Sequence, residues 1–173
     1  MNAPEPAVAL KPADDFESMT GQAGKWRGEC IQQFAELEQI IEGLLRDLRA
    51  TPRHGGKVDV GQPVGAAFKH LRELTGSKGP FAAKGKTISA TLAELAPWFE
   101  WRAHLTHGKL TVWRGRSGQW LLAFAHRPAA DEVVRTFALT WNEAGQLRSL
   151  LSKRVDTLAE NARSLANSVR KAH

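Results

Sequence analysis

Apolar residues recur at alternating steps of four and three over residues 30–48 of this chain. This spacing places side chains on one face of an α-helix, because the helix repeats about every 3.6 residues. It predicts a long amphipathic helix from Lys25 that ends before Thr51-Pro52, because proline disfavours helical geometry in the preceding residue. The stripe consists of Cys30, Phe34, Leu37, Ile41, Leu44 and Leu48, and is widened by Ile40 and Leu45.

The segment before this helix has a different character. Residues 1–23 contain three prolines and the acidic pair Asp14-Asp15, without a sustained apolar period. Such composition is typical of segments that do not join a packed core. We therefore expect a flexible N-terminal arm over residues 1–23, followed by a single domain over residues 24–173.

Two shorter helical patterns follow. One predicts a helix over residues 63–75, with Pro63 in its first turn and Gly76 past its end. Residues 77–86 are rich in glycine and lysine and are interpreted as a solvated loop. The next helix is expected to begin near Thr87 or Ser89 and to run to His107.

Two residues of this third helix indicate local irregularity. Pro97 lies inside the pattern and predicts a kink or a break, because proline lacks the N–H that the helix needs. Gly108 follows the last residue and favours a left-handed cap, which commonly ends a helix.

After Gly108 the apolar period changes from helical to two, which is typical of strands. A hairpin around residues 114–118, a third strand over residues 133–139 and a capping box from Thr140 to Glu143 are expected, and a long final helix follows. The fold class predicted is α+β and predominantly α: a helical bundle with a small antiparallel sheet before the last helix. The alternating residues of the hairpin are Leu110, Val112, Trp120, Leu122 and Phe124.

Composition limits the classes of function. The formal charge of +6 and pI of about 9.8 permit contact with phosphate-rich partners without requiring it. The single cysteine, Cys30, excludes an internal disulfide and is expected in the core rather than as a nucleophile. No apolar run approaches the roughly 20 residues of a membrane-spanning helix, and no secretory signal is recognisable. We expect a cytoplasmic protein that does not enter the membrane.

The end of the third helix is the stretch best suited to chemistry. Arg102 and His107 are separated by four residues and stand immediately before Gly108. Arginine holds phosphate through its planar donors, and histidine exchanges protons near neutral pH. Together they could cleave RNA without a metal ion, the histidine moving protons and the arginine stabilising charge on phosphorus.

The helix geometry sets a condition on this pair. Residues five apart point about 140° away from each other, since each residue turns the chain by about 100°. Arg102 and His107 therefore do not share a face of a regular helix. The two side chains could converge if the last turn distorts at Gly108, or if a two-fold homodimer brings two copies of this helix together. The composite dimer site is the more natural of the two.

Arg102, four intervening residues and His107-Gly108 at a helix end resemble the signature of the HEPN superfamily. The acidic and apolar run of residues 34–38 in the first helix is also similar to that superfamily. The resemblance implies a helical bundle, a homodimer and a metal-independent endoribonuclease without a cofactor, in which Arg102 and His107 are catalytic at the dimer interface. Ala103 departs from the pattern, because active members frequently carry a polar residue such as asparagine there.

Three further residues on this helix end, Glu100, His104 and Thr106, are expected in supporting positions. In one alternative, Arg102 pairs with Glu100 or another acid and His107 interacts with the helix end. The protein is then a non-catalytic helical module that binds a protein partner rather than RNA.

In the other alternative, a metal ion binds Glu100, His104 and His107, which steps of four and three place along one face. His126 would be a fourth ligand if the fold brought it there. No metalloprotease motif accompanies these residues, and the site is expected to contain no metal.

Overall fold

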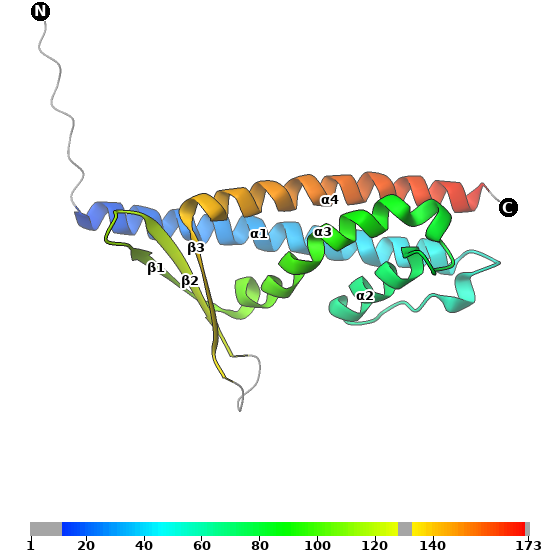
Figure 1. The fold of residues 1–173 in the computed structure, drawn as a ribbon, viewed down its shortest axis with the longest axis horizontal. Helices are drawn as coiled ribbons and strands as arrows, with labels where there is room; N and C mark the ends of the chain where they lie inside the picture. Colours follow the sequence, from blue (N-terminus) through cyan, green and yellow to red (C-terminus); the bar gives the residue numbers. More distant parts are fainter. Residues whose placement is uncertain (1–11, 128–132, 172–173) are drawn as a thin grey trace, which may run out of the picture.

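The computed structural model describes residues 12–127 and 133–171, with only the backbone described at positions 12–14 and 100. Helices predominate, and a small antiparallel sheet precedes the last helix, so the predicted α+β, predominantly α class is confirmed (Figure 1). The elements are α1 (Pro12–Arg49), a short 3₁₀ turn η1 (Gly55–Lys57), α2 (Val64–Thr75), α3 (Ala82–His107), β1 (Lys109–Arg114), β2 (Trp120–His126), β3 (Arg135–Thr140) and α4 (Trp141–Arg170).

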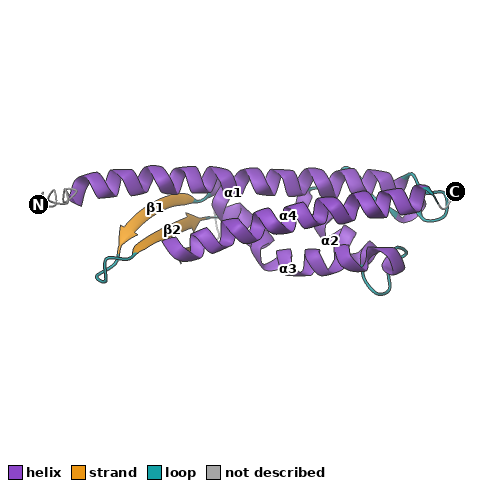
Figure 2. Ribbon diagram, turned by 90° about the horizontal axis from the view of Figure 1, so that it is seen from above, coloured by secondary structure: helices purple, strands orange, loops and turns teal. Residues whose placement is uncertain are grey.

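Helices α1 and α4 lie side by side and run in the same direction along the long axis (Figures 1 and 2). Residues early in α1 contact residues early in α4, and residues late in α1 contact residues late in α4, as expected for parallel helices. Trp26 Nε1 donates a 2.7 Å hydrogen bond to the carbonyl of Ala144 near one end, and Arg170 pairs with Asp47 near the other. Helix α3 runs the opposite way, so its C-terminal end lies beside the sheet and the N-terminal half of α1.

The apolar stripe predicted for the first helix is buried, as expected. Cys30, Leu37 and Ile41 have no exposed surface. Burial raises the pKa of the Cys30 thiol to about 12, which fits a core residue and not a nucleophile. The final helix likewise buries its predicted face: Leu147, Leu151, Val155, Leu158, Leu165 and Val169.

Helix α1 begins much earlier than predicted. Residues 12–23 are helical, and Met19 and Ala23 are 4% and 0% exposed, so the expected arm is wrong for this segment. Met19, Ala23, Trp26 and Cys30 continue the stripe at steps of four, three and four. A small alanine and an isolated methionine carry little apolar signal, which is why the periodicity was missed. Residues 1–11 of the expected arm lie outside the described residues.

Helix α3 also begins earlier than predicted, at Ala82 rather than Thr87 or Ser89, so residues 82–86 are not a loop. Gly85, which suggested a loop, is buried where α3 passes close to α2. A Cβ added there would lie 2.7 Å from the Cβ of Thr75, closer than side chains pack. The glycine therefore permits a close helix contact. Pro97 does not break the helix, which continues to His107.

The sheet has the order β1-β2-β3 with antiparallel pairing throughout. Val112 pairs with Leu122, and Leu122 pairs with Leu139, which places all three buried side chains on one face. The predicted hairpin is confirmed, and Gly118 takes a positive φ of 82° in its turn. The third strand lies slightly later than predicted.

The capping box that begins α4 is present as predicted. The hydroxyl of Thr140 accepts a 3.1 Å hydrogen bond from the N–H of Glu143, and the Glu143 carboxylate accepts one of 2.7 Å from the N–H of Thr140. Among the described helices, none carries an apolar stretch long enough to cross a membrane.

Candidate functional site

The C-terminal end of α3 holds most of the residues singled out by the sequence. Gly108, which follows the helix, has φ −73° and ψ 146°, so the predicted left-handed cap is wrong. Its N–H donates a 2.8 Å hydrogen bond to the carbonyl of His104. A Cβ at Gly108 would collide with that carbonyl oxygen. The position requires glycine because the backbone turns back closely on the last helical turn.

Arg27 of α1 secures this helix end from outside. Its Nε donates a 2.6 Å hydrogen bond to the carbonyl of Leu105, and one of its Nη atoms donates a 3.2 Å bond to the carbonyl of Thr106. Carbonyl groups in the last turn have no partner within the helix, and the C-terminal end carries partial negative charge. The Arg27 guanidinium donates hydrogen bonds to two of these carbonyl groups, and its positive charge balances the partial negative charge. Helix α1 therefore fixes the position of the candidate site.

Arg102 faces α1, where its guanidinium Nε pairs with the carboxylate of Glu38. Both side chains keep 28% of their surface exposed. The backbone carbonyl of Arg102 accepts a 2.9 Å hydrogen bond from the Thr106 hydroxyl, so this hydroxyl is used within the helix. Arg102 is thus held by its own chain, with an acid of α1 as its partner.

His107 points elsewhere. Its exposed imidazole lies beside His126 of β2, with 5.9 Å between the ring centroids and 32° between the ring planes. The structure therefore places Arg102 against α1 and His107 against the sheet, in agreement with the angle of about 140° between residues five apart. The pair does not converge within one chain.

His104 completes a cluster of three imidazoles, here called the histidine cluster: His104, His107 and His126. The rings of His104 and His126 lie 5.5 Å apart, and the edge of His104 also meets Phe137, with 5.1 Å between centroids. The Nδ1 atom of His104 is buried and has no hydrogen-bond partner among the described residues. Burial, followed by the charges of His126 and Arg135, lowers the pKa of His104. This imidazole is therefore harder to protonate than a histidine in water.

The metal interpretation depends on the Glu100 side chain, which lies outside the described part of the structure. Among the side chains that the structure describes, which do not include Glu100, no three from histidine, cysteine and acidic residues are arranged to hold a metal ion. His126 does reach the histidines of α3, as that interpretation required.

Sequence reasoning missed Arg27 and Glu38 as parts of this region, and gave His126 only a conditional role. Arg27 and Glu38 lie on the polar faces of α1, where nothing distinguishes them from solvated residues. His126 could have been found from the hairpin register: Lys109 pairs with Ala125, so His126 ends its strand beside the end of α3.

Comparison with known proteins identifies no relative. No family model, no curated protein and no solved structure matches this chain. The functional argument therefore depends on the residues themselves.

Proposed function

We propose that the protein is a HEPN-like, RNA-directed protein that cleaves RNA without a metal ion, at a site shared between two copies of the chain. The observation that carries the proposal is the exposed imidazole of His107 beside His126, 5.9 Å away between centroids, on a helix end secured by Arg27. Two neighbouring imidazoles can take and give protons in one reaction near neutral pH.

The chemistry requires two proton transfers. One imidazole removes the proton from a ribose 2′-hydroxyl, whose oxygen attacks the adjacent phosphorus. The bond from phosphorus to the 5′ oxygen breaks, and the second imidazole, protonated beforehand, gives its proton to that leaving oxygen. The products are a 2′,3′-cyclic phosphate and a 5′-hydroxyl. His107 and His126 are assigned these two roles, and His104, whose ring contacts that of His126, positions it.

Arg102 is assigned the binding of the phosphate. Its Nε is occupied by Glu38, whereas its Nη donors have no hydrogen-bond acceptor among the described residues. Glu38 therefore orients the guanidinium and leaves donors for an anion. Because Arg102 and His107 of one chain diverge, Arg102 of one copy would serve the histidines of the other.

The first test is cleavage of a labelled single-stranded RNA in the presence of excess chelator. Products with a 2′,3′-cyclic phosphate are expected from the wild type. Arg102→Ala, His107→Ala and His126→Ala should each reduce the rate at least a hundredfold with an unchanged fold. His70→Gln is the matched control, because His70 accepts a hydrogen bond from the Asp59 N–H far from this site. Loss of activity on chelation would contradict the proposal.

The second test addresses the shared site. Sedimentation at micromolar concentration should show two chains. Mixing inactive Arg102→Ala and His107→Ala proteins should restore activity, because a mixed dimer contains one intact Arg102 and one intact His107 that can face each other. A strict monomer, or a mixture without activity, would exclude a composite site.

A second candidate function is favoured by the Arg102–Glu38 ion pair. If both side chains serve only to hold α3 on α1, the protein is a non-catalytic helical module for a protein partner. In that case Arg102→Ala destabilises the fold, and Glu38→Gln does so equally. Neither variant then changes RNA binding or cleavage, because the wild type has none.

A further inference from the structure

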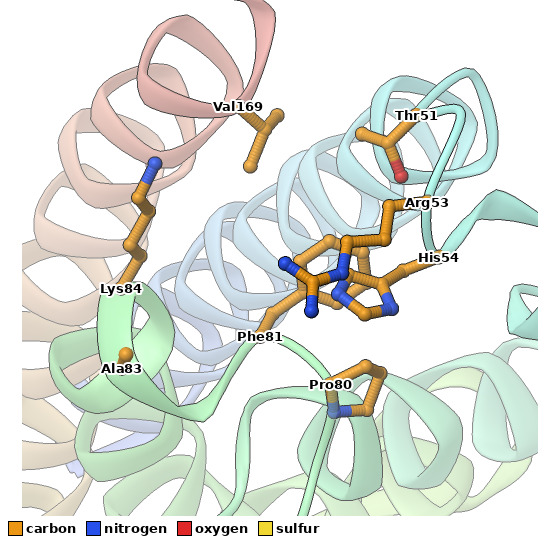
Figure 3. Close-up of a pocket in the computed structure, with 8 residues that line it drawn as sticks. All are labelled: Thr51, Arg53, His54, Pro80, Phe81, Ala83, Lys84 and Val169. Atoms are coloured by element: carbon orange, nitrogen blue, oxygen red, sulfur yellow. The ribbon is translucent and has the colours of Figure 1, made fainter. Parts of the chain in front are cut away.

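A cavity of about 260 Å³ lies at the opposite end of α3 from the histidine cluster. The length of α3, 26 residues, separates the two places by roughly 40 Å. The cavity is open to solvent on one side and is bounded by the connection after α1, the first turn of α3 and the last turn of α4 (Figure 3). Nothing in the proposed RNA cleavage uses it.

The polar lining of the cavity is basic. Arg53, His54 and Lys84 line it, and none of the lining residues that the structure describes is acidic. Arg53 makes no ion pair within the described residues, and its guanidinium extends into the space in front of Phe81 (Figure 3). An arginine without a carboxylate partner, turned into a cavity, offers a fork of donors that matches a phosphate group.

Lys84 adds a second fixed cation at the rim. Its Nζ donates a 3.0 Å hydrogen bond to the carbonyl of Ser168 near the end of α4, which holds the ammonium in place and leaves further N–H donors. The backbone N–H groups of Ala83 and Lys84, in the first turn of α3, have no acceptor among the described residues. These two N–H groups add hydrogen-bond donors beside the basic side chains, but the proposed site does not depend on them.

The remaining lining is apolar and partly aromatic. Phe81, Pro80 and Val169 contribute to it, and the ring of His54 stands edge-on to Phe81 with 5.6 Å between centroids. A cavity that combines a few converging polar groups with apolar walls is typical of small-ligand sites. Its volume suits a small molecule and is too small for a segment of polypeptide or nucleic acid.

We propose that this cavity binds a small phosphate monoester whose organic part is a flat apolar group. Arg53 and Lys84 balance the two negative charges of the monoester, and His54 adds a donor. The flat group lies against Phe81, Pro80 and Val169, where its apolar surface is removed from contact with water.

Phenyl phosphate is the probe, because it joins a phosphate monoester to a single ring. Isothermal titration of the full chain at low salt should show one site with a Kd below about 1 mM. Inorganic phosphate should bind at least threefold more weakly because it lacks the ring. Benzyl alcohol, which lacks the charge, should show no binding.

Arg53→Gln should weaken phenyl phosphate binding at least tenfold, because it removes the unpaired guanidinium. Arg53 is exposed and holds no other element, so the melting temperature should not change. Arg116→Gln, at the exposed hairpin turn, and Lys86→Gln, on α3 outside the cavity, are matched controls that should bind as the wild type does. Lys84→Gln should weaken binding and also lower stability slightly.

The proposal is overturned if the wild type shows no heat of binding up to about 5 mM phenyl phosphate. It is also overturned if Arg53→Gln binds as tightly as the wild type or if Arg116→Gln weakens binding equally. A short oligonucleotide without a terminal phosphate should not displace phenyl phosphate. Displacement would mean that the cavity recognises the phosphodiester backbone of a nucleic acid instead of a phosphate monoester.

Discussion

Arg27 and Leu105, which are far apart in the sequence, are joined by a 2.6 Å hydrogen bond from a guanidinium Nε to a main-chain carbonyl. The flanking Gly108 N–H caps only the His104 carbonyl of this helix end, and the Leu105 and Thr106 carbonyls are capped by the Arg27 side chain from another helix. The orientation of the histidine cluster therefore depends on the packing of α1 against α3.

Replacing Arg27 with glutamine should destabilise the protein by about 1.5–3 kcal/mol, because hydrogen bonds from a charged group are lost at a partly buried helix end. Urea unfolding measures this change. Lys25→Gln, an exposed substitution on the same helix, should change stability by less than about 0.5 kcal/mol. Equal effects of the two substitutions would mean that the cap contributes nothing.

Met19→Ala should cost about 2–5 kcal/mol, because it empties a buried position in the early part of α1. The exposed neighbour Glu17→Ala is its control and should be nearly neutral. Thermal unfolding distinguishes the two variants. A neutral Met19→Ala would restore the interpretation of this segment as an arm.

Gly108→Ala and Gly145→Ala should have opposite effects. At Gly108 the added Cβ collides with the backbone of His104, so we expect a loss of about 1–3 kcal/mol. At Gly145, inside α4, nothing lies within 4 Å of the added Cβ, so alanine should stabilise the helix by about 0.5–1 kcal/mol. Chemical unfolding of both variants tests the pair, and a stabilising Gly108→Ala would contradict the close approach.

The low pKa of His104 makes stability depend on pH. Its pKa in the folded state lies below the ordinary value of 6.5, so the unfolded chain binds the proton more readily. The contribution is fully present above pH 6.5 and is lost as the pH falls through the folded pKa. His126 and Arg135 face the ring and oppose its protonation.

We therefore expect the free energy of unfolding of the wild type to decrease between about pH 7 and pH 5 more steeply than that of His104→Phe. NMR titration of the His104 ring should give a midpoint below that of a histidine in an unfolded peptide. A midpoint at or above the peptide value would refute the assignment.

Much of the fold could be predicted because the signals were local. The stripe from Cys30 to Leu48, the alternation around the hairpin and the Thr140–Glu143 box each depend on neighbours in the sequence. Two of the errors concern glycines. Both were interpreted through backbone freedom, but close contacts determine them: Gly85 lies against Thr75 of α2, and Gly108 lies against the carbonyl of His104, four residues earlier.

The candidate site was harder to predict because its contacts join residues that are far apart in the sequence. The divergence of Arg102 and His107 followed from helix geometry alone. Their partners, Glu38 and His126, come from elements distant in the sequence, and no local pattern indicates which polar residue of α1 will meet α3. Sequence reasoning could identify the helix end but not the groups that surround it.

The burial of Cys30 has a practical consequence. With a pKa of about 12 and no exposed surface, its thiol cannot react with an alkylating reagent while the core around it remains packed. Since the chain has one cysteine, any labelling reports the opening of the core around α1. The rate of modification under native conditions thus measures how often the centre of the molecule opens, without an introduced probe.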